Sequence, residues 1–380
     1  MKGIEVPERT EDFTADPVEL FFDLAFVFAF SQLVARLIHD PTWSGVGETA
    51  LLFWLIWLPW SQFTWAANAV SGNGRGVRVY FLVATAASMP MAASITTAYD
   101  AGGPTFAISL CIIMAMGLST MLLSVGALEE HRGAIRGWMG RTVLAMAVLL
   151  VGSFLDGGAR TAVWILASLI IVFAMASAGH DEWLIRGGHF AERHGLILII
   201  ALGEIIVAIG LPVVRALDDG DGLEFSTLVA LVASGAFAGL MWWAYFDRVS
   251  PALEHRADTI DDAEQSGRYA RDVYTALHAV LVAGILVSAA SLEEIALHPT
   301  DTVPDRFRVM LFAGVGLTLL AVVACVWRAF HAVARERLVA VAAIGGVIAL
   351  TGAASGIVLI IAIDLILAAM LTLEHARIEG

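Results

Sequence analysis

Apolar stretches of about 17–25 residues recur along the whole chain, and a helix of that length can cross the hydrocarbon core of a bilayer. Hydrophobic residues make up 59% of the 380 residues and charged residues only 15%, whereas charged residues are about a quarter of a typical soluble domain. The hydrophobic core of a soluble protein could not bury so much apolar surface. The sequence therefore predicts an all-α polytopic membrane protein with little mass outside the bilayer.

Glycine, proline and charged residues divide the chain into about twelve apolar segments. We place these segments at residues 17–38, 48–70, 77–98, 105–127, 138–155, 160–177, 190–212, 225–247, 270–292, 307–329, 337–351 and 354–374. The fifth, sixth and eleventh segments are short. The predicted fold is a bundle of about twelve transmembrane helices.

The basic residues set the expected orientation. With the N-terminus in the cytoplasm, 17 of the 22 basic residues fall in cytoplasmic segments, and the opposite side keeps Arg36, Arg160, Arg215, Arg306 and Arg308. This bias agrees with the positive-inside rule. We expect a multi-pass protein of the inner (plasma) membrane with both termini in the cytoplasm.

The two halves of the chain share a pattern. An acidic residue opens the first and seventh segments, an aromatic run lies in the second and eighth, and a tyrosine opens the third and ninth. The paired positions are Glu19 with Glu192, 60–65 with 242–247, and Tyr80 with Tyr274. Six segments per half would give both halves the same orientation. We predict two parallel six-helix repeats, at residues 1–178 and 179–380, an arrangement found among transporters.

Acidic residues inside two of these segments are the strongest indication of a functional site. Glu19 and Asp23 are four residues apart and therefore share a helix face. At the start of the seventh segment, Glu192, Arg193 and His194 occupy the corresponding level. A charged group in hydrocarbon costs roughly 2.5 kcal/mol or more, so such groups commonly serve a function.

Further polar residues are predicted at a similar depth, in the cytoplasmic half of the membrane. They are Tyr80, Tyr274 and His278 and, as secondary candidates, Asn68 and Asp247. If the segments surround a common axis, these residues line a polar vestibule that opens to the cytoplasm. The structural alternative is that the acidic and aromatic residues cap helices, form interfacial belts or pair with Arg193.

Two carboxyl groups are predicted to lie deeper. Glu204 follows Arg193 by eleven residues, which is about 16 Å along a helix and nearly the same face. Asp364, a secondary candidate, reaches a similar depth in the last segment. A buried carboxyl stays protonated or finds a cation or hydrogen-bond donors, so these groups suit a proton relay or a cation site. The alternative is a neutral carboxyl bonded to a neighbouring helix.

Other motifs narrow the function less. Gly235 and Gly239 form a GxxxG motif, which favours helix packing within the chain over dimerisation. His189, Glu192 and His194 are chemically suited to bind a metal, but their spacing fits no standard motif, so no metal is expected. The chain has no Walker A, GxSxG or dinucleotide fingerprint, so no cofactor is expected. The net charge of −14 argues against nucleic acid as a partner.

Three blocks resemble a known family. Residues 18–29, from Val-Glu-Leu-Phe-Phe-Asp onward, resemble the signature of the bacterial low temperature requirement protein A (LtrA) family. The run Glu-Arg-His-Gly at 192–195 with Ala-Leu-Gly-Glu-Ile-Ile-Val-Ala at 201–208 is similar to the family's second block. A third similarity involves Tyr274, His278, Gly284, Ile285, His298 and Pro299. The resemblance implies a polytopic membrane protein and no particular chemistry.

Three functions are open. The leading hypothesis is a secondary transporter or permease, in one version coupled to protons. Asp23 and Glu204 would then titrate, while His194 and His278 would pass or sense protons. The second is an integral membrane enzyme acting on a lipid-soluble substrate at the cytoplasmic leaflet, with Glu19, Asp23 and His278 as acid–base groups. The third is a membrane scaffold or sensor without turnover. Membrane lipids and an unidentified small molecule or ion are the expected partners, and assembly into an oligomer is compatible with each function.

The orientation gives a first testable prediction. A reporter domain fused after Arg9 and another fused after Arg377 should both report from the cytoplasm, because 17 of the 22 basic residues lie on that side in the expected topology. Paired reporters that are active only in the cytoplasm or only in the periplasm make the measurement. A periplasmic signal from either fusion would overturn the orientation or the number of spans.

Overall fold

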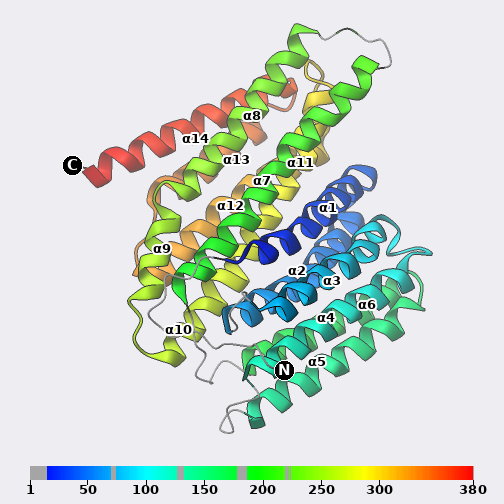
Figure 1. Cartoon of the computed structure of the whole chain (residues 1–380). Coiled ribbons are helices and arrows are strands. Elements are labelled where there is room, and N and C mark those ends of the chain that lie inside the picture. The colour runs from blue at the N-terminus through cyan, green and yellow to red at the C-terminus, as the bar shows by residue number, and fades with distance from the viewer. Residues whose placement is uncertain are drawn as a thin grey trace. The chain divides into compact units, whose positions relative to one another are not determined.

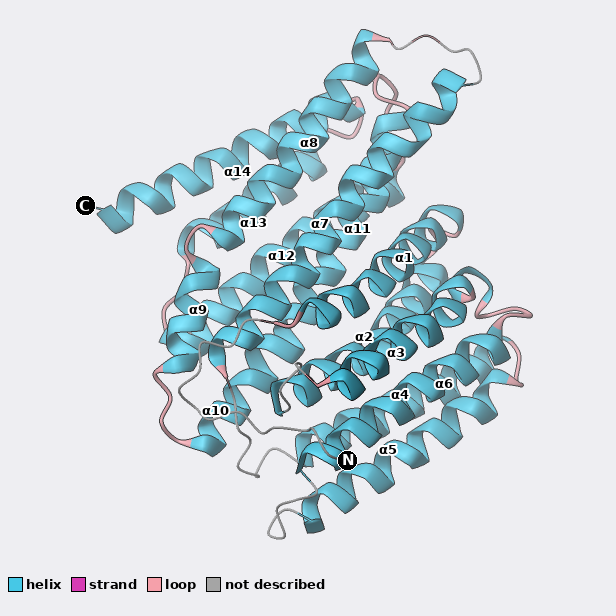
Figure 2. Ribbon diagram, in the orientation of Figure 1, coloured by secondary structure: helices cyan, strands magenta, loops and turns pink. Residues whose placement is uncertain are grey.

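A computed structural model describes residues 15–69, 74–125, 132–177, 186–218, 222 and 224–379. Within these ranges the regular structure is helical (Figure 2), apart from one isolated bridge between Thr302 and Ser355. This outcome confirms the all-α prediction for the described part of the chain.

The helices are labelled in chain order in Figure 1. They are α1 (Pro17–His39), α2 (Trp43–Ala69), α3 (Arg75–Ala93), α4 (Gly103–Val125), α5 (Arg132–Ser153), α6 (Gly157–Ser177), α7 (Gly187–Asp218), α8 (Phe225–Phe246), α9 (Val249–Asp258), α10 (Ala263–Tyr269), α11 (His278–Leu297), α12 (Asp305–Phe330), α13 (Arg335–Leu350) and α14 (Gly356–Glu379). A 3₁₀ turn (Ile95–Thr97) follows α3, and a π-helical segment (Ala270–Leu277) joins α10 to α11.

In the described part of the chain, nine helical stretches are long and apolar enough to cross a membrane. Helix α13 has 16 residues, which corresponds to about 24 Å, less than the roughly 30 Å of a hydrocarbon core. The apolar part of α5, Trp138–Ser153, is similarly short. A helix therefore lies over each expected segment, while the number of twelve spans stays a prediction.

The chain forms two compact units. The first comprises Met1–Leu33, Gly47–Leu196 and Glu254–Thr275, and the second comprises Val34–Val46, Ile197–Leu253 and Ala276–Gly380. This division follows contacts and does not test symmetry. The two repeats at residues 1–178 and 179–380 therefore stay a prediction.

In the first unit, consecutive helices from α3 to α6 pack on their neighbours. Buried apolar residues from α2, α4, α5 and α6 meet in one cluster: Ala66, Leu118, Trp138 and Ala174. The buried Arg160 donates to the carbonyl oxygens of Leu155 and Ala98 at 2.7 and 2.8 Å. A cation at carbonyl oxygens near helix ends is favourable. Arg160, expected on the outer side, thus has a structural role.

In the second unit, α11 packs along α12, and α14 packs on α13 and α8. The α11–α12 approach is close because two glycines face each other. A Cβ built on Gly284 would lie 2.6 Å from the carbonyl oxygen of Gly314, and one built on Gly314 would lie 2.7 Å from that of Gly284. Gly284, which the sequence analysis names only as part of a family resemblance, therefore permits backbone contact.

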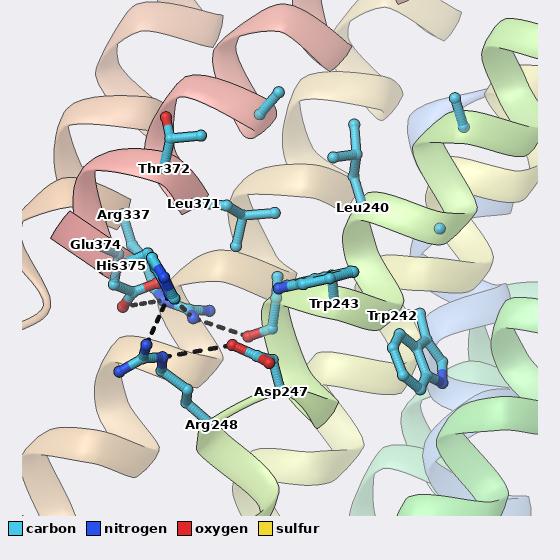
Figure 3. Close-up of a pocket in the computed structure, with 14 residues that line it drawn as sticks. Leu240, Trp242, Trp243, Asp247, Arg248, Arg337, Leu371, Thr372, Glu374 and His375 are labelled. Atoms are coloured by element: carbon cyan, nitrogen blue, oxygen red, sulfur yellow. Dashed lines mark hydrogen bonds and ion pairs between the residues drawn. The ribbon is translucent and has the colours of Figure 1, made fainter. Parts of the chain in front are cut away.

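Two buried arginines hold the ends of α13. At its C-terminal end, Arg308 donates to the carbonyl oxygens of Thr351, at 2.6 Å, and Ile348. At its N-terminal end, Arg337 donates to both carboxylate oxygens of Glu374 on α14, at 3.2 and 3.0 Å, and to the carbonyl oxygen of Ala244 on α8 at 2.7 Å (Figure 3). The guanidinium groups therefore connect α12, α13, α14 and α8.

The glycine contact can be tested with two neighbouring positions on α12. Gly314→Ala should destabilise the protein by roughly 1–3 kcal/mol, because the added methyl group overpacks the contact with α11. Gly316→Ala should be neutral or slightly stabilising, because the nearest described atom is 4.0 Å from its Cβ. Thermal unfolding of the detergent-solubilised protein measures both. Equal melting temperatures for the two variants would contradict the close approach.

Candidate functional site

The first turn of α1 places an acidic side chain inside the first unit. Asp16 caps the helix, since its Oδ1 accepts a hydrogen bond from the backbone N–H of Val18 at 3.0 Å. Pro17 follows at the position where proline favours a helix start. Asp16 serves as the cap, and the side chain of Glu19 contacts another helix. Of the structural alternatives for Glu19, pairing with Arg193 therefore holds and capping does not.

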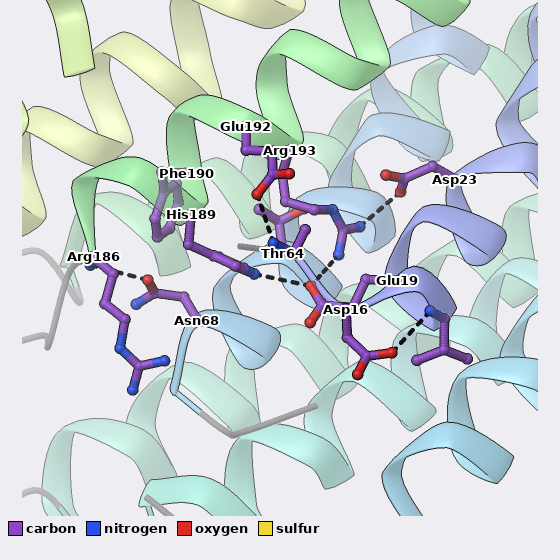
Figure 4. A network of polar contacts seen from close by, with 12 residues as sticks. Asp16, Glu19, Asp23, Thr64, Asn68, Arg186, His189, Phe190, Glu192 and Arg193 are labelled. Atoms are coloured by element: carbon purple, nitrogen blue, oxygen red, sulfur yellow. Dashed lines mark hydrogen bonds and ion pairs between the residues drawn. The ribbon is translucent and has the colours of Figure 1, made fainter. Parts of the chain in front are cut away.

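Two helix faces with complementary charges meet in this unit. On α1, Glu19 and Asp23 are four residues apart, and on α7, His189 and Arg193 are also four apart, so each pair lies on one face. Figure 4 shows the four side chains pointing toward one another. We call these four residues the buried ion cluster. Its geometry explains why α1 and α7 adjoin here.

Arg193 binds both carboxylates. Its Nη1 donates to Glu19 Oε2 and its Nη2 donates to Asp23 Oδ1, each at 2.7 Å. His189 Nε2 lies 2.9 Å from the same Glu19 oxygen. The indole N–H of Trp60 on α2 donates to Asp23 Oδ1 at 2.8 Å. The side chains of the cluster are at most 1% exposed, so the charges are shielded from solvent.

The cluster is not electrically balanced. Two carboxylates face one guanidinium, so the net charge is negative unless one proton resides on His189 or on a carboxyl group. Glu19 Oε1 and Asp23 Oδ2 are buried and have no hydrogen-bond partner among the described residues. An uncompensated buried charge is strongly unfavourable. The cluster is therefore neutral when it binds one proton.

His194 lies beside the cluster in an aromatic environment. Its ring centroid is 5.0 Å from that of Trp60, 5.1 Å from that of Tyr274 and 5.8 Å from that of Phe190. Its Nδ1 is 2.8 Å from the backbone carbonyl oxygen of Phe190. A carbonyl oxygen only accepts, so Nδ1 carries a hydrogen. Trp60 thus contacts both His194 and Asp23.

The π-helical segment is fixed against α2 through one residue. Thr275 accepts hydrogen bonds from the indole N–H groups of Trp57, at its carbonyl oxygen, and of Trp65, at its hydroxyl oxygen, both at 2.9 Å. Single π-turns inside α-helices are frequent at functional sites, because they alter the ordinary backbone bonding. Here the segment presents Tyr274 to His194.

Three predicted site residues of the first unit form hydrogen bonds outside the buried ion cluster. Glu192 Oε2 accepts from the backbone N–H of Ala15 at 2.6 Å, and Asn68 Oδ1 accepts from that of Arg186 at 3.0 Å (Figure 4). The hydroxyl of Tyr80 donates to the carbonyl oxygen of Met116 on α4 at 2.6 Å. These hydrogen bonds fix the residues that precede α1 and α7 and join α3 to α4. A binding role for the three residues stays a prediction.

The remaining candidates belong to the second unit. Glu204 and His278 are buried, and Nε2 of His278 lies 2.7 Å from the hydroxyl of Tyr245. Asp247 is 39% exposed and forms an ion pair with Arg248 at 3.4 Å. Asp364 is half-buried on α14. The expected vestibule draws on both units and stays a prediction.

The three residues that are chemically suited to bind a metal contact different partners. His189 contacts Glu19, His194 contacts Phe190, and Glu192 contacts Ala15. Among the described residues there is no group of three or more His, Cys, Asp or Glu side chains placed to hold a metal ion.

Sequence reasoning missed two members of the site. Trp60 entered only as part of an aromatic repeat motif, and His189 only as a metal ligand. A usable signal was present for His189: its spacing of four from Arg193 matches the spacing of Glu19 and Asp23, so two complementary faces were readable. Nothing in the sequence marks Trp60 among the chain's eleven tryptophans.

The nine apolar helical stretches found in the described residues indicate an integral, multi-pass membrane protein. The family model described as "Bacterial low temperature requirement A protein (LtrA)" matches residues 14–372, and the chain belongs to this family. It is also similar to the "Uncharacterized protein RA0937" of Rhizobium meliloti (strain 1021), with 28% identity over 309 residues, covering 77% of this chain and 72% of that protein. No solved structure matches the chain.

The charge balance of the cluster predicts unequal effects of two substitutions. Arg193→Ala leaves two buried carboxyl groups without their cation and should destabilise the protein by roughly 3–5 kcal/mol. Asp23→Asn removes the surplus negative charge, keeps an acceptor for Trp60 and Arg193, and should destabilise it much less. Thermal unfolding in detergent measures both, with the exposed Arg335→Ala as control. A milder effect for Arg193→Ala than for Asp23→Asn would contradict the assigned charges.

Proposed function

We propose that the protein is a proton-coupled secondary transporter or permease and that the buried ion cluster carries the coupling proton. The proposal includes the finer topology: about twelve spans, two parallel six-helix repeats, and both termini in the cytoplasm. The unknown substrate is a small molecule or an ion.

The observation that carries the proposal is the missing positive charge. Glu19 and Asp23 share one guanidinium, and each keeps an oxygen without a partner among the described residues. Replacing a buried ion network by apolar residues is often neutral or stabilising, so stability alone gives little reason for such a cluster. A site that is neutral with one proton and charged without it suits proton coupling.

The geometry provides a way for the proton to change the structure. Protonation of Asp23 weakens its charge-assisted bond to Arg193 Nη2, which is one of the links between α1 and α7 in the first unit. Loss of the proton restores the ion pair. Protonation therefore alters how firmly these two helices are held, which is the differential interaction that a two-state change requires.

Along α7, Glu204 is the next carboxyl group after the cluster on nearly the same helix face. Its side chain is 4% exposed. In the proposed mechanism Glu204 exchanges the proton with the opposite side of the membrane.

The enzyme alternative is less well supported. An acid or base has to reach the reacting atom of its substrate within hydrogen-bond distance. Glu19 and Asp23 are fully buried and already engaged by Arg193. These carboxyl groups therefore suit proton transfer at a place away from the substrate better than direct contact with the substrate.

Uptake by membrane vesicles tests the proposal and identifies the substrate in the same experiment. Vesicles containing the protein are given a mixture of cell metabolites and an imposed pH gradient, and the accumulated solutes are identified by mass spectrometry. At least one solute should accumulate with the wild type and not with Asp23→Asn, because the variant cannot bind the coupling proton. A protonophore should abolish the accumulation.

Asp301→Asn is the matched control, because this aspartate is 73% exposed and lies outside the cluster. It should transport like the wild type. Full uptake by Asp23→Asn at normal protein levels would show that the cluster is only structural. Uptake that persists with the protonophore would exclude proton coupling.

A further inference from the structure

An apolar groove runs between α8 and α14 in the second unit. It consists of two adjoining cavities of about 780 and 520 Å³, which share Ala236, Leu240 and Ala368 in their walls. Volumes of this size are typical of small-molecule sites. Figure 3 shows the larger cavity, with Leu240 and Trp243 from α8 and Leu371 from α14 around it.

Helix α8 contributes a glycine, Gly239, to the wall of the groove. No heavy atom of the described residues lies within 4 Å of a Cβ built on Gly235 or Gly239. The GxxxG motif therefore makes no close helix contact within the described chain, which corrects the expectation that it packs intramolecularly. Gly239 instead lines the larger cavity, where a side chain would occupy the groove.

One end of the groove is polar. Arg337 and Glu374 form their ion pair there, and Arg248 lies beside Asp247 and His375 (Figure 3). The side chain of Arg337 is 2% exposed, and its Nη1 is buried without a hydrogen-bond partner among the described residues. A buried N–H group without an acceptor is unfavourable, so an oxygen of a ligand bound at this end would satisfy it.

We propose that the groove binds a zwitterionic phospholipid of the surrounding membrane. Its phosphate accepts from Arg337 Nη1, and its acyl chain lies in the trough toward Leu240 and Ala368. Two guanidinium and two carboxylate groups line the polar end, so a headgroup carrying both a phosphate and an ammonium group matches them in charge. An anionic headgroup without the ammonium group leaves the carboxylates facing a like charge.

A second copy of the chain is the competing occupant, because GxxxG motifs also mediate helix dimers. A lipid fits the polar end better. The backbone carbonyls of a transmembrane helix are bonded within that helix, whereas a phosphate offers several free acceptor oxygens on a slender group. Such a group can accept from Nη1 of Arg337 without breaking a backbone hydrogen bond of a partner helix.

Photo-crosslinking in vesicles tests the assignment. The probe is a phosphatidylethanolamine with a diazirine in its acyl chain, and labelled peptides are mapped by mass spectrometry. Labelling should concentrate on α8 and α14 and fall about tenfold in Gly239→Leu, because the new side chain fills the trough. Gly140→Leu on α5, which also has no described atom within 4 Å of its Cβ, should label like the wild type.

Headgroup recognition is tested by competition. Unlabelled phosphatidylethanolamine should displace the probe, and phosphatidylglycerol, which lacks the ammonium group, should displace it less well. Arg337→Lys keeps the charge beside Glu374 but lacks the planar guanidinium group, so it should weaken labelling by the probe, because the phosphate loses its proposed donor. The preference for phosphatidylethanolamine should remain, because the carboxylates that favour its ammonium group are unchanged.

Three results would overturn the proposal: even labelling of all lipid-facing helices, equal displacement by both lipids, or a protein–protein crosslink through Gly239 that excludes the probe. The last result would identify a second copy as the occupant. None of these results bears on proton coupling, which concerns Glu19, Asp23 and Glu204.

Discussion

A carboxylate inside a bilayer requires a cation or a proton, and the contact between α1 and α7 follows from this requirement at Glu19 and Asp23. Arg193 supplies one positive charge to both. Moving either helix by one residue would turn its face by about 100° and separate the partners. The same guanidinium therefore fixes the register of two helices and leaves the site one charge short. Geometry and chemistry at this site have one origin.

The two units differ in how far they enclose their polar side chains. In the first, the charges are enclosed by aromatic rings, and Trp60 links Asp23 to the ring of His194. In the second, Arg337 lies at the wall of a groove with open volume beside it. The enclosed site favours a species as small as a proton, whereas the groove favours a long amphiphile. The structure thus separates the group that we assign to energy coupling from the surface that we assign to lipid.

Periodicity and charge predicted the helices and one side of the cluster, because the spacing of four between Glu19 and Asp23 places them on one helix face. The helices were predictable, whereas the partners of the polar side chains were not. Tyr80 bonds to the backbone of α4, and Asn68 bonds to the backbone of Arg186. The bond from Trp60 to Asp23 joins residues 37 apart in the chain, and the π-helical turn at Thr275 depends on tertiary contacts with α2. Local sequence patterns therefore predict neither the bond between Trp60 and Asp23 nor the π-helical turn.

The cluster also has a consequence for how the protein is made. Glu19 and Arg193, which form the ion pair, are 174 residues apart in the chain. Synthesis proceeds at roughly 5–20 residues per second. For about 9–35 s, the first helix therefore exists without its cation. During that interval its two acidic groups either hold protons or stay at the membrane surface. In either case the ion pair forms only after the seventh helix has been translated, so α1 is made first but reaches its final contacts late.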